Sequence, residues 1–219
     1  MLFSLIMFLV CLNLFSQKIY LNENGIEINK EKFLENWRNE ELNLYRWDYI
    51  KKDSGRVAKL NTNRFNYFKV NYDTIIKQLN VLSKKIIPND AIIIIEYEFS
   101  NDLCSAENEN KWTKNRLKTR HDFLAFVEKK IHDENAKNYY FKLFDKDLVI
   151  SDYIDSIDNY IIDKNDFFKT NFFNNPALCG SHVLIKPDGF AMVKNGEDRT
   201  DFLLKYLEQK VWDEIFKLE

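Results

Sequence analysis

The run AIIIIEYEF, residues 91–99, constrains the fold more than any other part of the chain. It has the length of one strand, is rich in β-branched residues and lacks the full polar alternation of a strand with one solvated face. Such a run is typical of a strand buried on both faces, so we expect it at the centre of a sheet covered by other layers. At 219 residues, 45% of them hydrophobic, the chain is long enough to bury a core, and we expect one main domain with an elaborated end; two small domains are the alternative.

The segments after this run predict alternating helices and strands. Leu117, Leu124, Val127 and Ile131 form an apolar stripe at helical spacing. Pro187-Asp188-Gly189 lies between two apolar runs and predicts a turn, because proline presets φ and glycine permits positive φ. The expected order is a strand at 91–99, a helix at 112–132, a strand at 139–144, a helix at 157–173, the strands HVLIK and FAMVK around the turn, and a helix at 199–216.

The preceding part of the chain predicts a mixed α+β extension over residues 17–88. KIYLN indicates a short strand and NKEKFLENWR a helix, while YRWDYI and RVAKL flank a hairpin connection. YDTIIKQLNVLSKK has apolar residues at helical spacing, and Pro88 ends that helix.

The first residues indicate a secretory leader. MLFSLIMFLVCLNLFSQ begins with an apolar segment without charged side chains, too short for a comfortable membrane span of about 20 residues. We expect residues 1–16 to be removed, Cys11 to be discarded with them, and the mature protein to be periplasmic or secreted with no membrane span. A retained membrane anchor is the alternative.

Charge and motifs exclude several classes of function. The net charge is −2 with interleaved basic and acidic residues, so we expect no nucleic-acid partner. The sequence contains no phosphate-binding glycine loop, no hydrolase nucleophile motif and no EF-hand loop. The three histidines do not have the spacing of zinc ligands, so we expect neither a cofactor nor a metal. The basic run 111–120 could bind an anion or activate a thiol, but a solvated helix face is the simpler interpretation.

The order of elements from Ala91 onward, together with VLIKPDGFAMVKNGED, resembles the thioredoxin-like fold over about 130 residues. The chain is also similar to uncharacterised exported bacterial proteins. The resemblance implies an α/β domain at 89–219 with a thioredoxin-like central mixed sheet flanked by helices. The C-x-x-C of the redox enzymes is replaced by Cys104-Ser105-Ala106-Glu107, and the stretch 180–182 lacks the proline that the family places there.

The resemblance also implies that Cys104 and Cys179 could be neighbours, because the loops that carry them lie side by side in that fold. We favour a non-catalytic binding or structural protein with a Cys104–Cys179 disulfide; two buried thiols would fit the same function. The alternative is a thiol-disulfide oxidoreductase or redox sensor that uses both cysteines, with His182 or His121 as base. A domain that binds a small ligand near the same loops is a third possibility, and the sequence does not identify the partner, whether protein or small ligand.

Overall fold

The computed structural model describes residues 18–42, 44–51, 55–62, 65–102, 110–174, 176–177, 179–196, 205–206 and 208–215. The chain divides into two compact units, and the boundary between them along the sequence lies between Thr62 and Asn63. The boundary predicted from the sequence lies at residue 88, but β4 (Phe65–Lys69) and α3 (Tyr72–Ser83) belong to the larger unit, where β4 joins the main sheet.

The described residues of the N-terminal unit form a three-stranded sheet and the helix α2. Strand β3 (Gly55–Asn61) pairs in parallel with β1 (Ile19–Leu21) and antiparallel with β2 (Tyr45–Lys51), which confirms the predicted hairpin. Helix α2 (Lys30–Arg38) begins at its cap Asn29, whose side chain accepts from the backbone of Lys32, and the 3₁₀ turn η2 (Glu40–Leu42) follows the helix. Phe33 of α2 packs with Ala58 and Leu60, so an apolar residue of the helix closes one face of the sheet.

A buried carboxylate ties this unit together. Asp48 is 3% exposed and accepts hydrogen bonds from Arg46 Nε and Nη2 at 2.7 Å and from Lys18 Nζ at 2.5 Å. Burial would raise the pKa of Asp48, but the hydrogen bonds from Arg46 and Lys18 hold it below its usual value.

We expect Asp48→Asn to destabilise this unit by about 2 kcal/mol, because the two cations lose a charge-assisted acceptor. The change should appear as roughly 30-fold faster hydrogen exchange of the amide protons of β2 and β3. Glu35→Gln, which removes the exposed Lys32–Glu35 pair, is the control and should leave exchange unchanged. Equal exchange in the two variants would show that Asp48 is not a structural anchor.

The larger unit contains a six-stranded mixed sheet in the order β4-β11-β10-β5-β7-β9. Strands β5, β7 and β9 are parallel, whereas β10 and β11 form the predicted hairpin, with β4 antiparallel at its edge. The remaining bounds are β5 (Ile92–Glu98), β6 (Lys111–Trp112), α4 (Lys114–Glu134), β7 (Asn138–Asp145), β8 (Val149–Ile150), η3 (Asp152–Ser156), β9 (Tyr160–Asp163), α5 (Phe167–Asn171), β10 (Ser181–Ile185), β11 (Phe190–Asn195) and α6 (Gln209–Ile215).

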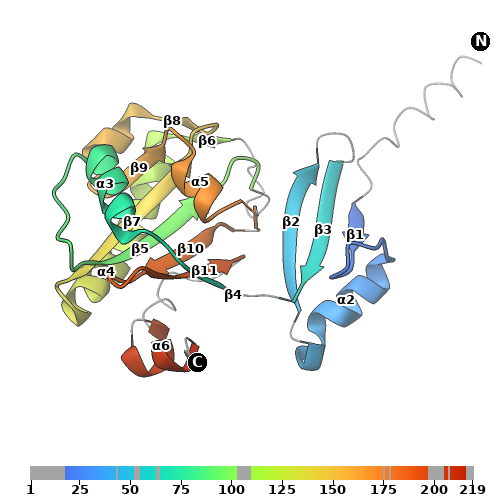
Figure 1. Ribbon diagram of the computed structural model, residues 1–219. Coiled ribbons are helices and arrows are strands. Elements are labelled where there is room, and N and C mark those ends of the chain that lie inside the picture. Colours follow the sequence, from blue (N-terminus) through green and yellow to red (C-terminus); the bar gives the residue numbers. More distant parts are fainter. Residues whose placement is uncertain are drawn as a thin grey trace, which may run out of the picture. The chain divides into compact units, whose positions relative to one another are not determined.

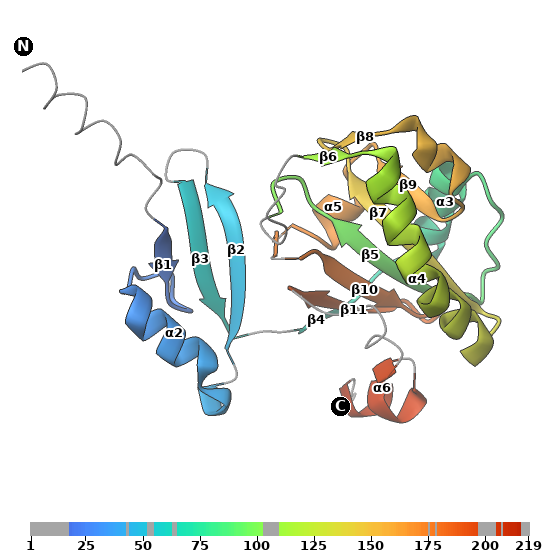
Figure 2. The same cartoon turned by 180° about the vertical axis from the view of Figure 1, so that it is seen from behind.

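Helices cover both faces of this sheet, as the run at 91–99 predicts. Ile93, Ile95 and Tyr97 of β5 pack in the core on the side of α3 and α5, which face the viewer in Figure 1. Ile94 packs on the opposite side with Leu124 of α4, the helix that lies in front in Figure 2. Strand β5 lies between β10 and β7, so its predicted interior position in the sheet is confirmed.

The predicted helix at 157–173 is wrong. That segment contains the strand β9, which pairs with β7, and the short helix α5. The apolar residues Tyr160 and Ile161 are both buried because β9 is covered on both faces, so they show no strand alternation. Strand β4 was not predicted, and of the expected helix at 199–216 the structure describes α6 and residues 205, 206 and 208.

Among the described residues, no helix combines the length and apolar character needed to cross a membrane. Residues 1–16, the predicted leader, lie outside the described part of the chain.

Candidate functional site

Cys179 lies in the loop that leads into β10, at the edge of the sheet where β5 and β7 end. Its backbone N–H donates to Asp102 Oδ1 at 3.0 Å. Asp102 follows β5 and precedes Cys104 by two positions, while Cys104 itself lies outside the described residues. The loop after β5 and the loop before β10 are therefore in contact, and the cysteine pairing stays a prediction.

The turn at Cys179 needs an unusual backbone. Cys179 has a φ of 63° and Gly180 a φ of 84°, so two successive residues lie in the left-handed region. A Cβ at Gly180 would lie 2.8 Å from the backbone oxygen of Tyr97 on β5. Glycine is therefore required here by conformation and by close approach of the neighbouring strand.

A second network fixes the start of the loop after β5. Ser100 donates to Asp145 Oδ2 through its hydroxyl at 2.8 Å and its backbone N–H at 3.2 Å. Lys169, on α5, donates to the same oxygen at 2.7 Å. Burial would raise the pKa of Asp145, but these hydrogen bonds hold it below its usual value. The ionised Asp145 at the end of β7 thus joins the β5 loop to α5.

Asn101 and Asn110 bond to each other across the segment that contains Cys104. The Asn101 N–H donates to Asn110 Oδ1 at 2.5 Å, and Asn110 Nδ2 donates to Asn101 Oδ1 at 2.8 Å. Val149 of β8 donates its N–H to the Asn110 carbonyl at 2.6 Å. The residues on either side of 103–109 are therefore held together and anchored to the domain.

His182, the candidate base, lies inside the core rather than at the loop surface. It is 1% exposed, and neither ring nitrogen has a hydrogen-bond partner among the residues that the structure describes; its Nε2 lies 3.9 Å from Glu96 Oε2. Burial lowers the pKa of His182 to about 4, despite the opposing charge of Glu96. A buried imidazole with this pKa is uncharged at neutral pH and is a weak base.

His182 belongs to a line of polar side chains that crosses the sheet, which we call the polar row. One residue from each of five adjacent strands contributes at the same level: Lys194, His182, Glu96, Lys142 and Tyr160. The row lies on the α4 side, since Ile94 and Leu184, two positions away along β5 and β10, pack in the core beneath that helix.

Glu96 is the hub of the polar row. Its Oε1 accepts from Lys142 Nζ at 2.5 Å and from Arg120 Nη2 of α4 at 2.6 Å, and its Oε2 accepts from the Tyr140 hydroxyl at 2.7 Å. Lys142 also donates to Glu98 Oε1 at 2.5 Å. Burial would raise the pKa of Glu96, but the charges of Lys142 and Arg120 hold it well below its usual range.

The side chains of His121 and of the basic run 111–120 contact other residues of the larger unit. His121 lies on α4 with its ring edge-on to Tyr160, at a centroid distance of 5.8 Å. In the basic run, Arg116 lies over Trp112 at 4.1 Å and Lys118 pairs with Asp122 at 2.6 Å, while Arg120 binds Glu96. Within the described ranges, no group of three or more His, Cys, Asp or Glu side chains is arranged to hold a metal ion.

The polar row was not predicted from the sequence, although the sequence contains a signal for it. Glu96 and Glu98 follow the apolar residues of β5, Lys142 lies among the apolar and aromatic residues of β7, and a buried charge needs a partner of opposite sign. Their pairing depends on the register of β5 against β7, which requires the folded sheet.

No family model and no curated protein matches this sequence. A proposal of function therefore depends on the geometry at the sheet edge and in the core.

Proposed function

We propose that this protein is an exported, periplasmic or secreted, non-catalytic binding or structural protein with a thioredoxin-like domain and a Cys104–Cys179 disulfide. The observation that carries the proposal is the hydrogen bond from the Cys179 N–H to Asp102. Cys104 is two residues from Asp102, a chain length of about 7 Å, and a disulfide requires Cα atoms within about 7 Å of each other.

The order of elements supports the thioredoxin-like part of the proposal. Strand β5, helix α4, strand β7, the hairpin β10–β11 and helix α6 follow one another along the chain, with β5 and β7 parallel and the hairpin antiparallel to β5. Strands β4 and β9 are additions at the two edges of the sheet.

The proposed cleavage lies before the first described strand. Strand β1 begins at Ile19, and Lys18 binds the buried Asp48. Both residues follow the expected leader, residues 1–16, so its removal would leave this strand and this ion pair in the mature chain.

The environment of His182 supports a non-catalytic role. The imidazole is held in the polar row, 3.9 Å from Glu96, and its depressed pKa disfavours proton abstraction from a thiol at neutral pH. Non-reducing peptide mass mapping of protein recovered from its own compartment, followed by titration against glutathione, tests the proposal. We expect Cys104 and Cys179 to be linked, with a reduction potential below about −300 mV. A potential between about −120 and −270 mV would instead indicate a redox enzyme or sensor. Two unlinked thiols would contradict the proposed disulfide.

Asp102→Ala is expected to make the disulfide easier to reduce. The loss of one hydrogen bond worth about 1 kcal/mol corresponds to an increase in potential of about 20 mV, since about 30 mV equals 1.4 kcal/mol for two electrons. Asp122→Ala, on the exposed side of α4, is the control and should leave the potential unchanged. The same potential in both variants would show that Asp102 does not hold the two loops together.

A further inference from the structure

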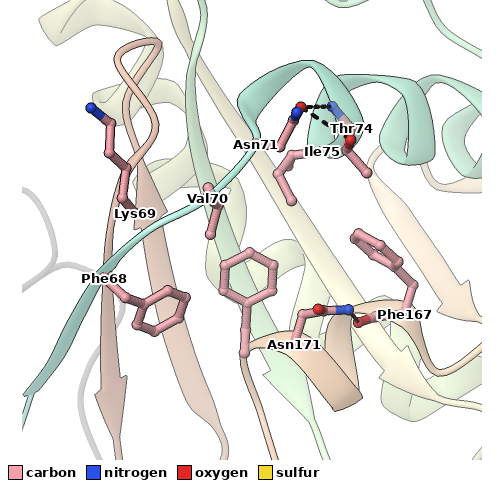
Figure 3. Close-up of a pocket in the computed structure, with 9 residues that line it drawn as sticks. Phe68, Lys69, Val70, Asn71, Thr74, Ile75, Phe167 and Asn171 are labelled. Atoms are coloured by element: carbon pink, nitrogen blue, oxygen red, sulfur yellow. Dashed lines mark hydrogen bonds between the residues drawn. The ribbon is translucent and has the colours of Figure 1, made fainter.

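A pocket of about 350 Å³ lies between the end of β4, the first turn of α3 and helix α5. Figure 3 shows aromatic and aliphatic side chains on its walls, contributed by all three elements. The apolar lining consists of Phe68, Val70, Ile75, Phe167 and Phe172. The Phe68 and Phe172 rings lie 5.7 Å apart at an angle of 30°.

Two amide side chains supply polar atoms at the rim. Asn71 uses its Oδ1 to accept from the Thr74 N–H at 2.9 Å and hydroxyl at 3.0 Å, which caps α3. Asn171 uses its Nδ2 to donate to the Phe167 carbonyl at 2.7 Å. Within the described part of the chain, Asn71 Nδ2 remains as a donor and Asn171 Oδ1 as an acceptor on different walls.

Among the described residues that line the pocket there is no carboxylate, and the one cationic residue is directed elsewhere. Lys69 points away from the space between the phenyl rings in Figure 3, and its Nζ lies 5.1 Å from the centre of the Phe190 ring. A charged ligand would lose its hydration here without gaining an ion pair, which is costly.

We propose that this pocket binds an uncharged aromatic group that carries an N–H or hydroxyl at its edge. The volume is within the range of small-molecule sites, and an apolar cavity of about 150 Å³ already holds benzene, so a fused ring fits. The phenyl walls provide ring contacts, while Asn171 and Asn71 provide one acceptor and one donor for the polar edge. The group is either a free molecule or an aromatic side chain of a polypeptide.

Calorimetric titration of the full mature chain with indole, p-cresol and N-acetyl-tryptophan amide tests the proposal and distinguishes the two sources. We expect saturable binding of at least one probe, with indole-3-acetate and tryptamine, the charged analogues, at least tenfold weaker. Tighter binding of the free molecules identifies a small ligand, and tighter binding of the amide identifies a polypeptide side chain. Absence of saturable binding by all three neutral probes overturns the proposal.

Val70→Trp fills the pocket and should weaken binding at least tenfold. Val81→Trp is the matched control, because Val81 also lies in the α3 region but is 68% exposed and does not line the pocket. Amide shift mapping on the unmodified protein locates the ligand even if Val70→Trp fails to fold, and shifts centred on Thr74, Ile75 and Asn171 are expected. Equal binding by a folded Val70→Trp variant, or shifts centred elsewhere, contradicts the assignment.

Discussion

Replacing Lys142 with methionine is expected to lower the free energy of unfolding of the larger unit by about 3 kcal/mol, as found when one member of a buried ion pair is removed. The Lys142 side chain is 0% exposed, and its ammonium group lies between Glu96 and Glu98. Methionine has a similar length but no charge, so the variant leaves the buried Glu96 and the partly buried Glu98 without the ammonium group between them, with Arg120 still bound to Glu96. Urea denaturation measures the effect.

Two further variants show whether the loss comes from burial of charge. Lys118→Met removes an ion pair of similar length, 2.6 Å, between side chains that are more than half exposed, and should be indistinguishable from the unmodified protein. Adding Glu96→Gln to Lys142→Met removes one of the uncompensated charges and should recover part of the stability. If Lys142→Met is no less stable than Lys118→Met, the polar row does not stabilise the fold.

Strands and helices were predictable where one physical signal dominated. The run at 91–99 indicated a doubly buried strand, and Pro187-Asp188-Gly189 indicated the hairpin that became β10–β11. The apolar stripe at Leu117, Leu124, Val127 and Ile131 indicated α4, and all four side chains are buried. In each case the local sequence pattern and the tertiary structure favour the same element.

The elements that were missed are short and depend on their neighbours. Strand β9 has four residues, and its pairing with β7 brings Asp163 opposite Asp145, which no local pattern indicates. Strand β4 has five residues and exists as the outer partner of β11. Their backbone hydrogen bonds require strands that are distant in sequence, so propensity alone did not identify them.

The candidate site was predictable only in part. The sequence, through its resemblance, suggested that the loops of Cys104 and Cys179 lie together, and the hydrogen bond between Asp102 and Cys179 supports this. The sequence could not show that the His182 side chain lies in the core. The face of the sheet on which a side chain lies depends on the register of its strand, and β10 pairs His182 with Glu96 of β5 and Lys194 of β11.

His182 gives the second large expected effect, a stability that depends on pH. Its pKa is about 4 in the folded protein and 6.5 in an unfolded chain. The unfolded state therefore binds a proton first as the pH falls, and stability is lost between pH 6.5 and 4. At about 1.4 kcal/mol per pKa unit, this loss is about 3 kcal/mol. Burial of the ring is the main reason why the folded state resists this proton, and the positive charges of Lys194 on β11, Lys142 on β7 and Arg120 on α4 add to it, while the charge of Glu96 on β5 opposes it.

The contribution of Glu128 on α4 to stability depends on pH in the opposite direction. Burial and the charge of Glu96 raise the pKa of Glu128 to about 7, so the folded state binds this proton first and gains stability as the pH falls from about 7 to 4.5. The two groups partly offset each other in the unmodified protein. A single stability profile therefore conceals both effects, and differences between variants must be measured.

The free energy of unfolding of His182→Gln should rise relative to the unmodified protein by about 3 kcal/mol between pH 7 and pH 4, because glutamine does not titrate. Glu128→Gln should change in the opposite direction over the same range. Urea denaturation at pH 7, 6, 5 and 4 measures both differences, and His132→Gln, in the last turn of α4, serves as a histidine control. A pH-independent difference for His182→Gln would mean that the imidazole accepts a proton as readily in the core as in the unfolded chain. The polar row would then be an environment that tolerates a further positive charge.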